Sequence, residues 1–176
     1  MSAILNVLPM RRGRSAALPG AMQCLQLFPP NCKGRSRIYA IAFKGGIVKV
    51  GKTNNPRTRL RDHWARGNGE VEWVHLFAPM HERTARAVEM DAPAVLSAFL
   101  HPVNASEWFR GSTDRDRILP LLRACIDKCR AEVAARMNRE AEDAATKHRA
   151  LAVLKAAGIH DVSMYSLHVV ATKQAA

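Results

Sequence analysis

The chain has 176 residues, enough for one compact domain with extensions. Lys and Arg total 27 against 15 Asp and Glu, so the formal charge is +12 and a solvated surface of this protein attracts polyanions. No apolar run approaches the roughly 20 residues that span a bilayer, and Arg11 and Arg12 follow the first apolar stretch instead of preceding it, unlike a secretory signal. We therefore expect no membrane partner and a cytoplasmic protein.

Residues 1–36 are predicted to form a basic leader with little structure of its own. Four prolines and three glycines interrupt any periodic pattern in this segment. Residues 1–37 contain six basic side chains and no acidic one, so they carry half of the formal charge of +12. The apolar patches Ile4–Leu8 and Leu25–Phe28 leave open whether part of the leader docks on a core.

Two strands joined by a tight turn are predicted after the leader. Ile38–Phe43 is a continuous apolar run, typical of a strand buried on both faces, and Ile47–Val50 favours a second strand. Gly45 and Gly46 stand between them and indicate a hairpin, because glycine tolerates the positive φ angles of tight turns.

A helix is predicted after the hairpin. Asn55 suits its N-cap and Pro56 its first position, where the missing N–H of proline costs nothing. The helix continues through Arg59 and His63, which lie one turn apart and therefore share one face. It is expected to stop at Gly67.

The next segment completes a small domain. Residues 71–77 predict a third strand, and a helix is expected to begin near Met80. Pro93 is expected to kink or split this helix and to leave a second helical piece through Leu100. The β-β-α-β-α order predicts an α+β fold over residues 37–112, with a three-stranded antiparallel sheet flanked by helices.

A long helix is predicted over residues 113–157, and residues 158–176 are expected to form a short tail. Ser112, Thr113 or Asp114 suits the N-cap of this helix. Its apolar stripe either packs on the domain or pairs with a second copy, which would make a homodimer. The stripe repeats at near-heptad spacing and consists of Ile118, Leu122, Cys125, Cys129 and Val133.

The four cysteines form no CxxC pair. Cys125 and Cys129 lie one helical turn apart, a spacing at which two zinc ligands can meet. No second ligand pair stands at a suitable distance along the chain, so the preferred interpretation is two buried thiols in a reducing compartment.

Four short motifs in the predicted domain resemble one known family. They are Arg37-Ile38-Tyr39, Lys49-Val50-Gly51-Lys52-Thr53, Arg59-Leu60-Arg61-Asp62-His63 and Glu107-Trp108-Phe109. In order and spacing they resemble the GIY-YIG endonuclease superfamily. They are most similar to its phage-type branch, described as a DNA-binding domain, in which the second motif reads Lys-Ile-Gly-Lys-Thr and a Glu-Trp-Phe closes the domain. The resemblance covers Tyr39 to Phe109, under half of the chain.

The resemblance implies metal-assisted hydrolysis of a phosphodiester in DNA. It implies Tyr39 near the nucleophilic water, Arg59 on the scissile phosphate, and His63 at a position where many relatives have a functional histidine. These residue types suit the chemistry, because a guanidinium grips phosphate with two donors and a phenol can relay a proton.

The resemblance also implies one acidic residue that holds a divalent ion, Mg²⁺ or Mn²⁺. A hard ion of this kind keeps most of its waters, so one carboxylate can suffice. The sequence Ala87-Val88-Glu89 in the helix after the third strand favours Glu89. Asp91 and Glu82 are the alternatives.

Two positions depart from the family pattern. Arg37 replaces the leading glycine of the first motif, and Lys49 replaces the tyrosine of the second. A two-residue Gly-Gly turn pairs Lys52 with Tyr39 and turns Lys49 to the opposite face of the sheet. In that register the site uses Lys52, and only a bulge or a longer loop brings Tyr39 and Lys49 together.

The basic surface and the missing tyrosine leave three functions open. Seven basic residues lie between Lys44 and Arg66 against one acid, Asp62, which favours phosphate contacts. The first hypothesis is a metal-dependent endonuclease that acts on DNA. The alternative is a DNA-binding module that keeps the fold without turnover. The third is a helix-mediated assembly protein that touches nucleic acid only through its tail. Independently of these, Tyr39 is either a site residue or a core residue of its apolar strand. The predicted nucleic-acid contacts beyond the catalytic set are Lys44, Arg57, Arg61 and Arg66.

Overall fold

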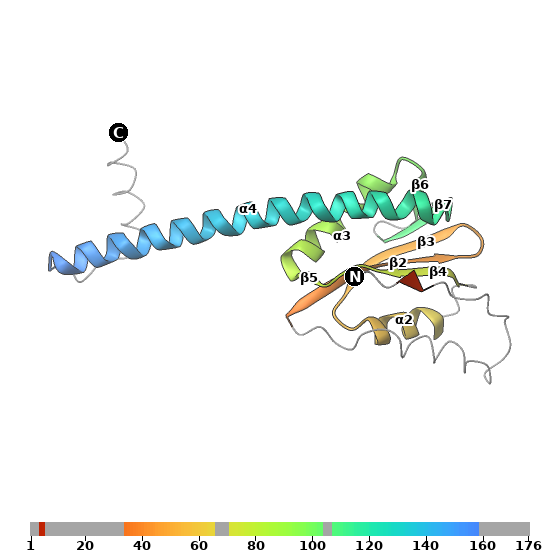
Figure 1. The fold of residues 1–176 in the computed structure, drawn as a ribbon, viewed down its shortest axis with the longest axis horizontal. Coiled ribbons are helices and arrows are strands. Elements are labelled where there is room, and N and C mark those ends of the chain that lie inside the picture. The colour runs from red at the N-terminus through yellow and green to blue at the C-terminus, as the bar shows by residue number, and fades with distance from the viewer. Residues whose placement is uncertain (1–3, 6–33, 66–70, 104–106, 159–176) are drawn as a thin grey trace. The chain divides into compact units, whose positions relative to one another are not determined.

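The computed structural model describes residues 4–5, 34–65, 71–103 and 107–158 (Figure 1). The chain divides into two compact units, Met1–Arg130 and Ala131–Ala176. The predicted α+β class is confirmed: an antiparallel sheet with helices is followed by a long C-terminal helix. Within the described residues, no helix combines the length and the apolar character needed to cross a membrane.

The described strands and helices follow the predicted order, with four short strands in addition. The strands are β1 (Ile4–Leu5), β2 (Arg35–Phe43), β3 (Ile47–Thr53), β4 (Val71–Leu76), β5 (Met80–His81), β6 (Leu100–Val103) and β7 (Trp108–Gly111). The helices are α2 (Pro56–Ala65), α3 (Glu82–Leu96) and α4 (Arg115–Ala156).

The sheet is wider than the three strands predicted from the sequence. Its order is β1-β4-β2-β3-β7-β6, and β5 pairs with the first residues of β2. The three predicted strands, β2, β3 and β4, form its centre, and every described pairing is antiparallel. The short strands β6 and β7 extend the sheet beyond β3 and so define one edge of the domain.

The predicted split of the second helix at Pro93 was wrong. Helix α3 begins at Glu82, two residues after the predicted start, and is continuous past Pro93 to Leu96. Its buried face, Thr84, Ala85, Val88, Ala92 and Leu96, continues across the proline, so packing on the sheet offsets the one lost backbone hydrogen bond. Leu100 does not extend a helix but begins β6.

The turn between β2 and β3 has three residues, which corrects the predicted register. Phe43 pairs with Ile47, so Lys44, Gly45 and Gly46 form the turn, with φ of 96° at Gly45 and 77° at Gly46. The additional turn residue shifts the pairing by one position and reverses the face of every side chain on β3.

As a result, Tyr39 pairs with Gly51, and Ile38 pairs with Lys52. Lys49 pairs with Ile41 and shares the face of Tyr39, whereas Lys52 lies on the opposite face. The pairing of Lys52 with Tyr39, expected for a two-residue turn, was therefore wrong. The alternative of a longer loop, which brings Tyr39 and Lys49 to one face, is confirmed.

The sheet is covered on both faces (Figure 1). Tyr39, Ile41 and Phe43 pack with Leu60 of α2 on one face. Alternate residues of β2, Ile38 and Ala40 among them, pack on the other face with α3 and the first part of α4. Burial on both faces explains why the sequence of β2 is a continuous apolar run.

The apolar stripe of α4 packs within the first unit. Ile118, Leu122, Cys125 and Cys129 are buried in the core beside α3 and the sheet, and Asp114 caps the helix by accepting from the Asp116 N–H at 3.0 Å. These four residues of the stripe are therefore used inside the chain, whereas Val133 belongs to the second unit and is half-buried. Pairing of two copies through the helix stays a prediction.

The two cysteines of α4 are buried thiols outside any disulfide, as preferred from the sequence. Burial raises the pKa of Cys125 to about 12, with a further contribution from Cys129. In the described part of the chain, no group of three or more His, Cys, Asp or Glu side chains is arranged to hold a metal ion.

Helix α4 offers a direct test of this packing. Leu122 is fully buried, so we expect Leu122→Ala to lower the free energy of unfolding by about 2–5 kcal/mol through lost contacts and a residual cavity. Val153 on the same helix is 68% exposed, and Val153→Ala should change stability by less than about 0.5 kcal/mol. Urea denaturation of both variants measures the difference. Equal costs would contradict the packing of the first part of α4 on the sheet.

Gly51 lies directly under the ring of Tyr39. A Cβ atom at position 51 would lie 2.6 Å from the Tyr39 hydroxyl oxygen and 2.8 Å from its Cζ. These separations are too short for any side chain, so the glycine of the second motif provides room for the buried phenol.

We expect Gly51→Ala to cost about 1–3 kcal/mol of stability, because Tyr39 is fully buried and cannot move aside freely. Gly45→Ala is the control for backbone strain alone, since its Cβ meets nothing within 4 Å while its φ is +96°. Thermal and urea unfolding measure both variants. A Gly51→Ala protein as stable as the wild type would refute the contact.

Candidate functional site

The end of β3 lies at an opening in the sheet. Strand β7 pairs with β3 only at Ile47, Val48 and Lys49, and a last hydrogen bond runs from the Val50 N–H to the Glu107 carbonyl at 3.0 Å. Among the described strands, the last residues of β3, Gly51 to Thr53, pair with β2 alone. On the opening side, the Lys52 N–H donates to Glu89 Oε1 of α3 at 3.2 Å.

A cavity of about 590 Å³ occupies this opening, between the first turns of α2 and the first half of α3. Polar and charged side chains make up its lining, which suits a polar ligand. The lining residues are Ser36, Lys52, Thr53, Asn54, Asn55, Thr58, Arg59, Asp62, Glu82 and Glu89.

Helix α2 presents Arg59 to the cavity. As predicted, Asn55 caps the helix: its Oδ1 accepts from the Thr58 N–H at 3.2 Å, and its carbonyl accepts from the Arg59 N–H at 3.1 Å. Pro56 is the first helical residue, also as predicted. The cap fixes the rotation of α2 so that Thr58, Arg59 and Asp62 line one wall.

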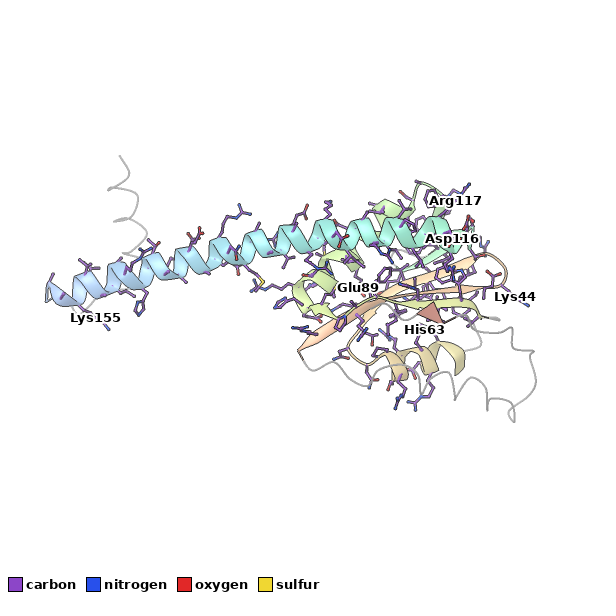
Figure 2. The ribbon with its side chains drawn as sticks, viewed as in Figure 1. Lys44, His63, Glu89, Asp116, Arg117 and Lys155 are labelled. Carbon is purple, nitrogen blue, oxygen red and sulfur yellow. The ribbon has the colours of Figure 1, made fainter. Side chains whose placement is uncertain are left out.

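The hydroxyl of Tyr39 lies between α2 and the sheet. It forms a hydrogen bond of 3.0 Å with His63 Nε2 (His63 is labelled in Figure 2), and it interacts with Arg59. Burial raises the pKa of Tyr39, and the positive charge and hydrogen bond of Arg59 partly offset this. Tyr39 is 0% exposed and His63 is 7% exposed, so Arg59 links this buried pair to the cavity wall.

The three candidate acids on α3 have different surroundings. Glu89 lines the cavity and accepts a backbone N–H, which leaves its negative charge in place. Glu82 also lines the cavity, but its carboxylate is paired with Lys52 and accepts from Ser36. Asp91 is not part of the lining and forms an ion pair of 3.3 Å with Lys128 of α4.

These surroundings fit an ion that takes few protein ligands. Glu89 provides a charged oxygen ligand in a polar cavity that is large enough for water and phosphate. Mg²⁺ and Mn²⁺ prefer such oxygen ligands and retain several waters. The arrangement does not suit an ion that needs a cage of several side chains, since the described residues contain no three-ligand cluster.

The two lysines of the second motif occupy different places. Lys52 lines the cavity, although its strand position faces away from Tyr39. Lys49 shares the face of Tyr39 but is 5% exposed and outside the cavity lining. It is ion-paired with Glu107, and its Nζ lies 5.1 Å from the centre of the Trp108 ring. Burial lowers the pKa of Lys49, and the contact with Glu107 opposes this shift.

The predicted nucleic-acid contacts are not gathered at the cavity. Arg57 and Arg61 are exposed on α2 and absent from the lining, and Arg66 lies outside the described residues. Lys44 is in the β2–β3 turn, at the other end of β3 from the cavity, and Figure 2 shows it far from Glu89.

Several lining residues were missed by sequence reasoning. Ser36, Thr58 and Asp62 stand in or beside the recognised motifs, yet only the register and the rotation of α2 reveal that they face the cavity. Glu107 belongs to the closing motif Glu107-Trp108-Phe109. The structure shows that it is the partner of Lys49, while Phe109 of the same motif is a core residue.

Comparison with known proteins identifies a family. The T5orf172 domain matches residues 36–133, which is more than half of the 176-residue chain. Neither a curated protein nor a solved structure gives a match. The matched range contains the hairpin, both helices that line the cavity and the start of α4. The chain therefore belongs to the T5orf172 domain family, a nuclease-related member of the GIY-YIG-like superfamily.

Proposed function

We propose that this protein is a divalent-metal-dependent endonuclease that hydrolyses phosphodiester bonds in DNA at the cavity beside the end of β3. The observation that carries the proposal is the arrangement of Arg59, Glu89 and the Tyr39 hydroxyl. Arg59 and Glu89 line the same cavity, and the buried Tyr39 hydroxyl contacts Arg59.

Arg59 is the proposed phosphate ligand. It is exposed at the wall of a polar cavity, and its planar guanidinium matches the oxygens of a phosphodiester with two parallel hydrogen bonds. Because negative charge accumulates on these oxygens during hydrolysis, a fixed cation at this place stabilises the transition state more than the ground state.

Glu89 is the proposed ligand of Mg²⁺ or Mn²⁺. The Lys52 N–H holds one carboxylate oxygen in place at the cavity. A divalent ion bound there would supply Lewis acidity to the phosphate and a more acidic bound water. The remaining positions around the ion are left for water and for phosphate oxygens.

Tyr39 and His63 form the proposed proton path. Hydrolysis joins a water oxygen to phosphorus and breaks one P–O ester bond, so the water must lose a proton, here to Tyr39 and His63, and the leaving oxygen gains one from solvent. Because burial raises the pKa of Tyr39, its phenol stays protonated at neutral pH. It can therefore accept a proton only while passing its own to a neighbour, and His63 Nε2 at 3.0 Å can accept it when the ring hydrogen is on Nδ1.

A DNA-binding module without turnover is the second candidate. It is favoured by the complete burial of Tyr39 and by Lys49, which replaces the second phenol and is held by Glu107 away from the cavity. In this case the cavity would bind a phosphate through Arg59 and Lys52 without cleaving the chain.

Nicking of supercoiled plasmid in Mg²⁺ or Mn²⁺ tests the proposal. We expect metal-dependent nicking by the wild type, and a loss of about 10²-fold or more in Arg59→Ala because the transition-state charge is no longer stabilised. Glu89→Gln should be inactive at metal concentrations that saturate the wild type, since the amide is a much poorer ligand.

Asp91→Asn is the matched control, because it removes the same charge from the same helix two residues further along, outside the cavity. It should nick at the wild-type rate. Nicking that is lost in Asp91→Asn and kept in Glu89→Gln would move the ion to Asp91. A wild type that binds DNA in a salt-sensitive manner and never nicks it would establish the second candidate.

A further inference from the structure

Glu82 occupies a distinct position among the acids of the cavity, because both of its carboxylate oxygens are engaged. Ser36 Oγ donates to Oε2, and Lys52 Nζ donates to Oε1. These hydrogen bonds hold the pKa of Glu82 below its usual range, with Lys52 as the larger cause, so the carboxylate is charged. The Glu82–Lys52 ion pair and its contact with Ser36 thus connect the start of β2, the end of β3 and the N-terminus of α3.

Ser36 anchors this pair to the sheet. It is 3% exposed and lies in the segment of β2 that pairs with β5, where Ser36 is opposite Met80. Its hydroxyl therefore holds Oε2 at a fixed place and leaves Oε1 turned toward Lys52. An exposed ion pair without such an anchor would leave the lysine mobile.

Lys52 contacts the two glutamates of the cavity in different ways. Its backbone N–H donates to Glu89, and its side chain pairs with Glu82. Glu89 thereby keeps its charge for an ion, whereas the charge of Glu82 is balanced by the ammonium. Both carboxylates belong to α3, yet the backbone of Lys52 contacts one and its side chain contacts the other.

We propose that Glu82 is a positioning residue that, together with Ser36, holds the Lys52 ammonium at the cavity wall to receive a phosphate oxygen of the bound nucleic acid. The inference rests on the proposed function. A lysine side chain has four rotatable bonds, and fixing them before the substrate arrives removes a cost from binding in the productive geometry. Lys52 on β3 and Arg59 on α2 then approach the phosphate from different walls of the cavity.

A double-mutant cycle on Glu82 and Lys52 in the full chain tests this inference. Single-turnover nicking, the Mg²⁺ concentration for half-maximal rate, and DNA affinity at two salt concentrations are measured for Glu82→Gln, Lys52→Ala and the double variant. We expect Glu82→Gln to slow nicking about tenfold or more, because the ammonium is misplaced. Its Mg²⁺ requirement should be unchanged and its DNA affinity should not fall, because an acid has been removed.

The double variant should be no slower than Lys52→Ala alone, since Glu82 acts through Lys52. Glu72→Gln removes the same charge from an exposed position of β4 outside the cavity and should leave nicking unchanged. Ser36→Ala should slow nicking less than Glu82→Gln, and in the same direction.

Three results would overturn the inference. A higher Mg²⁺ requirement in Glu82→Gln, with the full rate restored at saturation, would make Glu82 a metal ligand. An unchanged rate would reduce the contact to a surface ion pair, and additive losses in the double variant would separate Glu82 from Lys52. If the wild type does not nick, the proposed function fails, and the same cycle is then measured in DNA affinity. A change in DNA affinity caused by Glu82→Gln that is the same in the presence of Lys52 and of Ala at position 52 would also refute the positioning role.

Discussion

The pairing of Tyr39 with Gly51 is the constraint on which the site depends. Because position 51 has no side chain, the phenol ring fits against β3 and its hydroxyl reaches His63 and Arg59 of α2. The same register turns Lys52 toward α3, where it meets Glu82 and Glu89. One hairpin register thus places Gly51 against the phenol and Lys52 against the acids of α3, and a shift by one residue would turn Lys52 to the face of Tyr39.

Short pairing between β3 and β7 creates the space for this chemistry. Strand β7 covers the first half of β3, through Trp108 and Phe109, and leaves the second half to α2 and α3. Two cationic side chains line the opening, Arg59 from α2 and Lys52 from β3. Lys49, by contrast, is buried outside the cavity lining, and its charge is balanced by Glu107.

The sequence predicted the parts of this structure that follow from local chemistry. The Asn55-Pro56 helix start, the apolar strand β2 and the stripe of α4 each appear where their residue types place them. The turn length was not predictable, because Gly45-Gly46 suits a two-residue and a three-residue turn alike. Since the turn length sets the strand register, the sequence could not predict which face of the sheet Lys49 and Lys52 occupy. The predicted split at Pro93 failed because tertiary packing of α3 on both sides of the proline outweighs its local cost to the helix. The roles of Glu82 and Glu107 depend on partners 30 and 58 residues away, which no local pattern reveals.

The central claim is that the buried Tyr39 hydroxyl takes part in cleavage, and Tyr39→Phe tests it most directly. The substitution keeps the ring over Gly51 and removes only the oxygen that contacts His63 and Arg59. Single-turnover nicking at saturating Mg²⁺ should fall by about 10²-fold or more, with DNA affinity and folding stability close to those of the wild type. Nicking at the wild-type rate would show that Tyr39 is a core residue and that the proton path lies elsewhere.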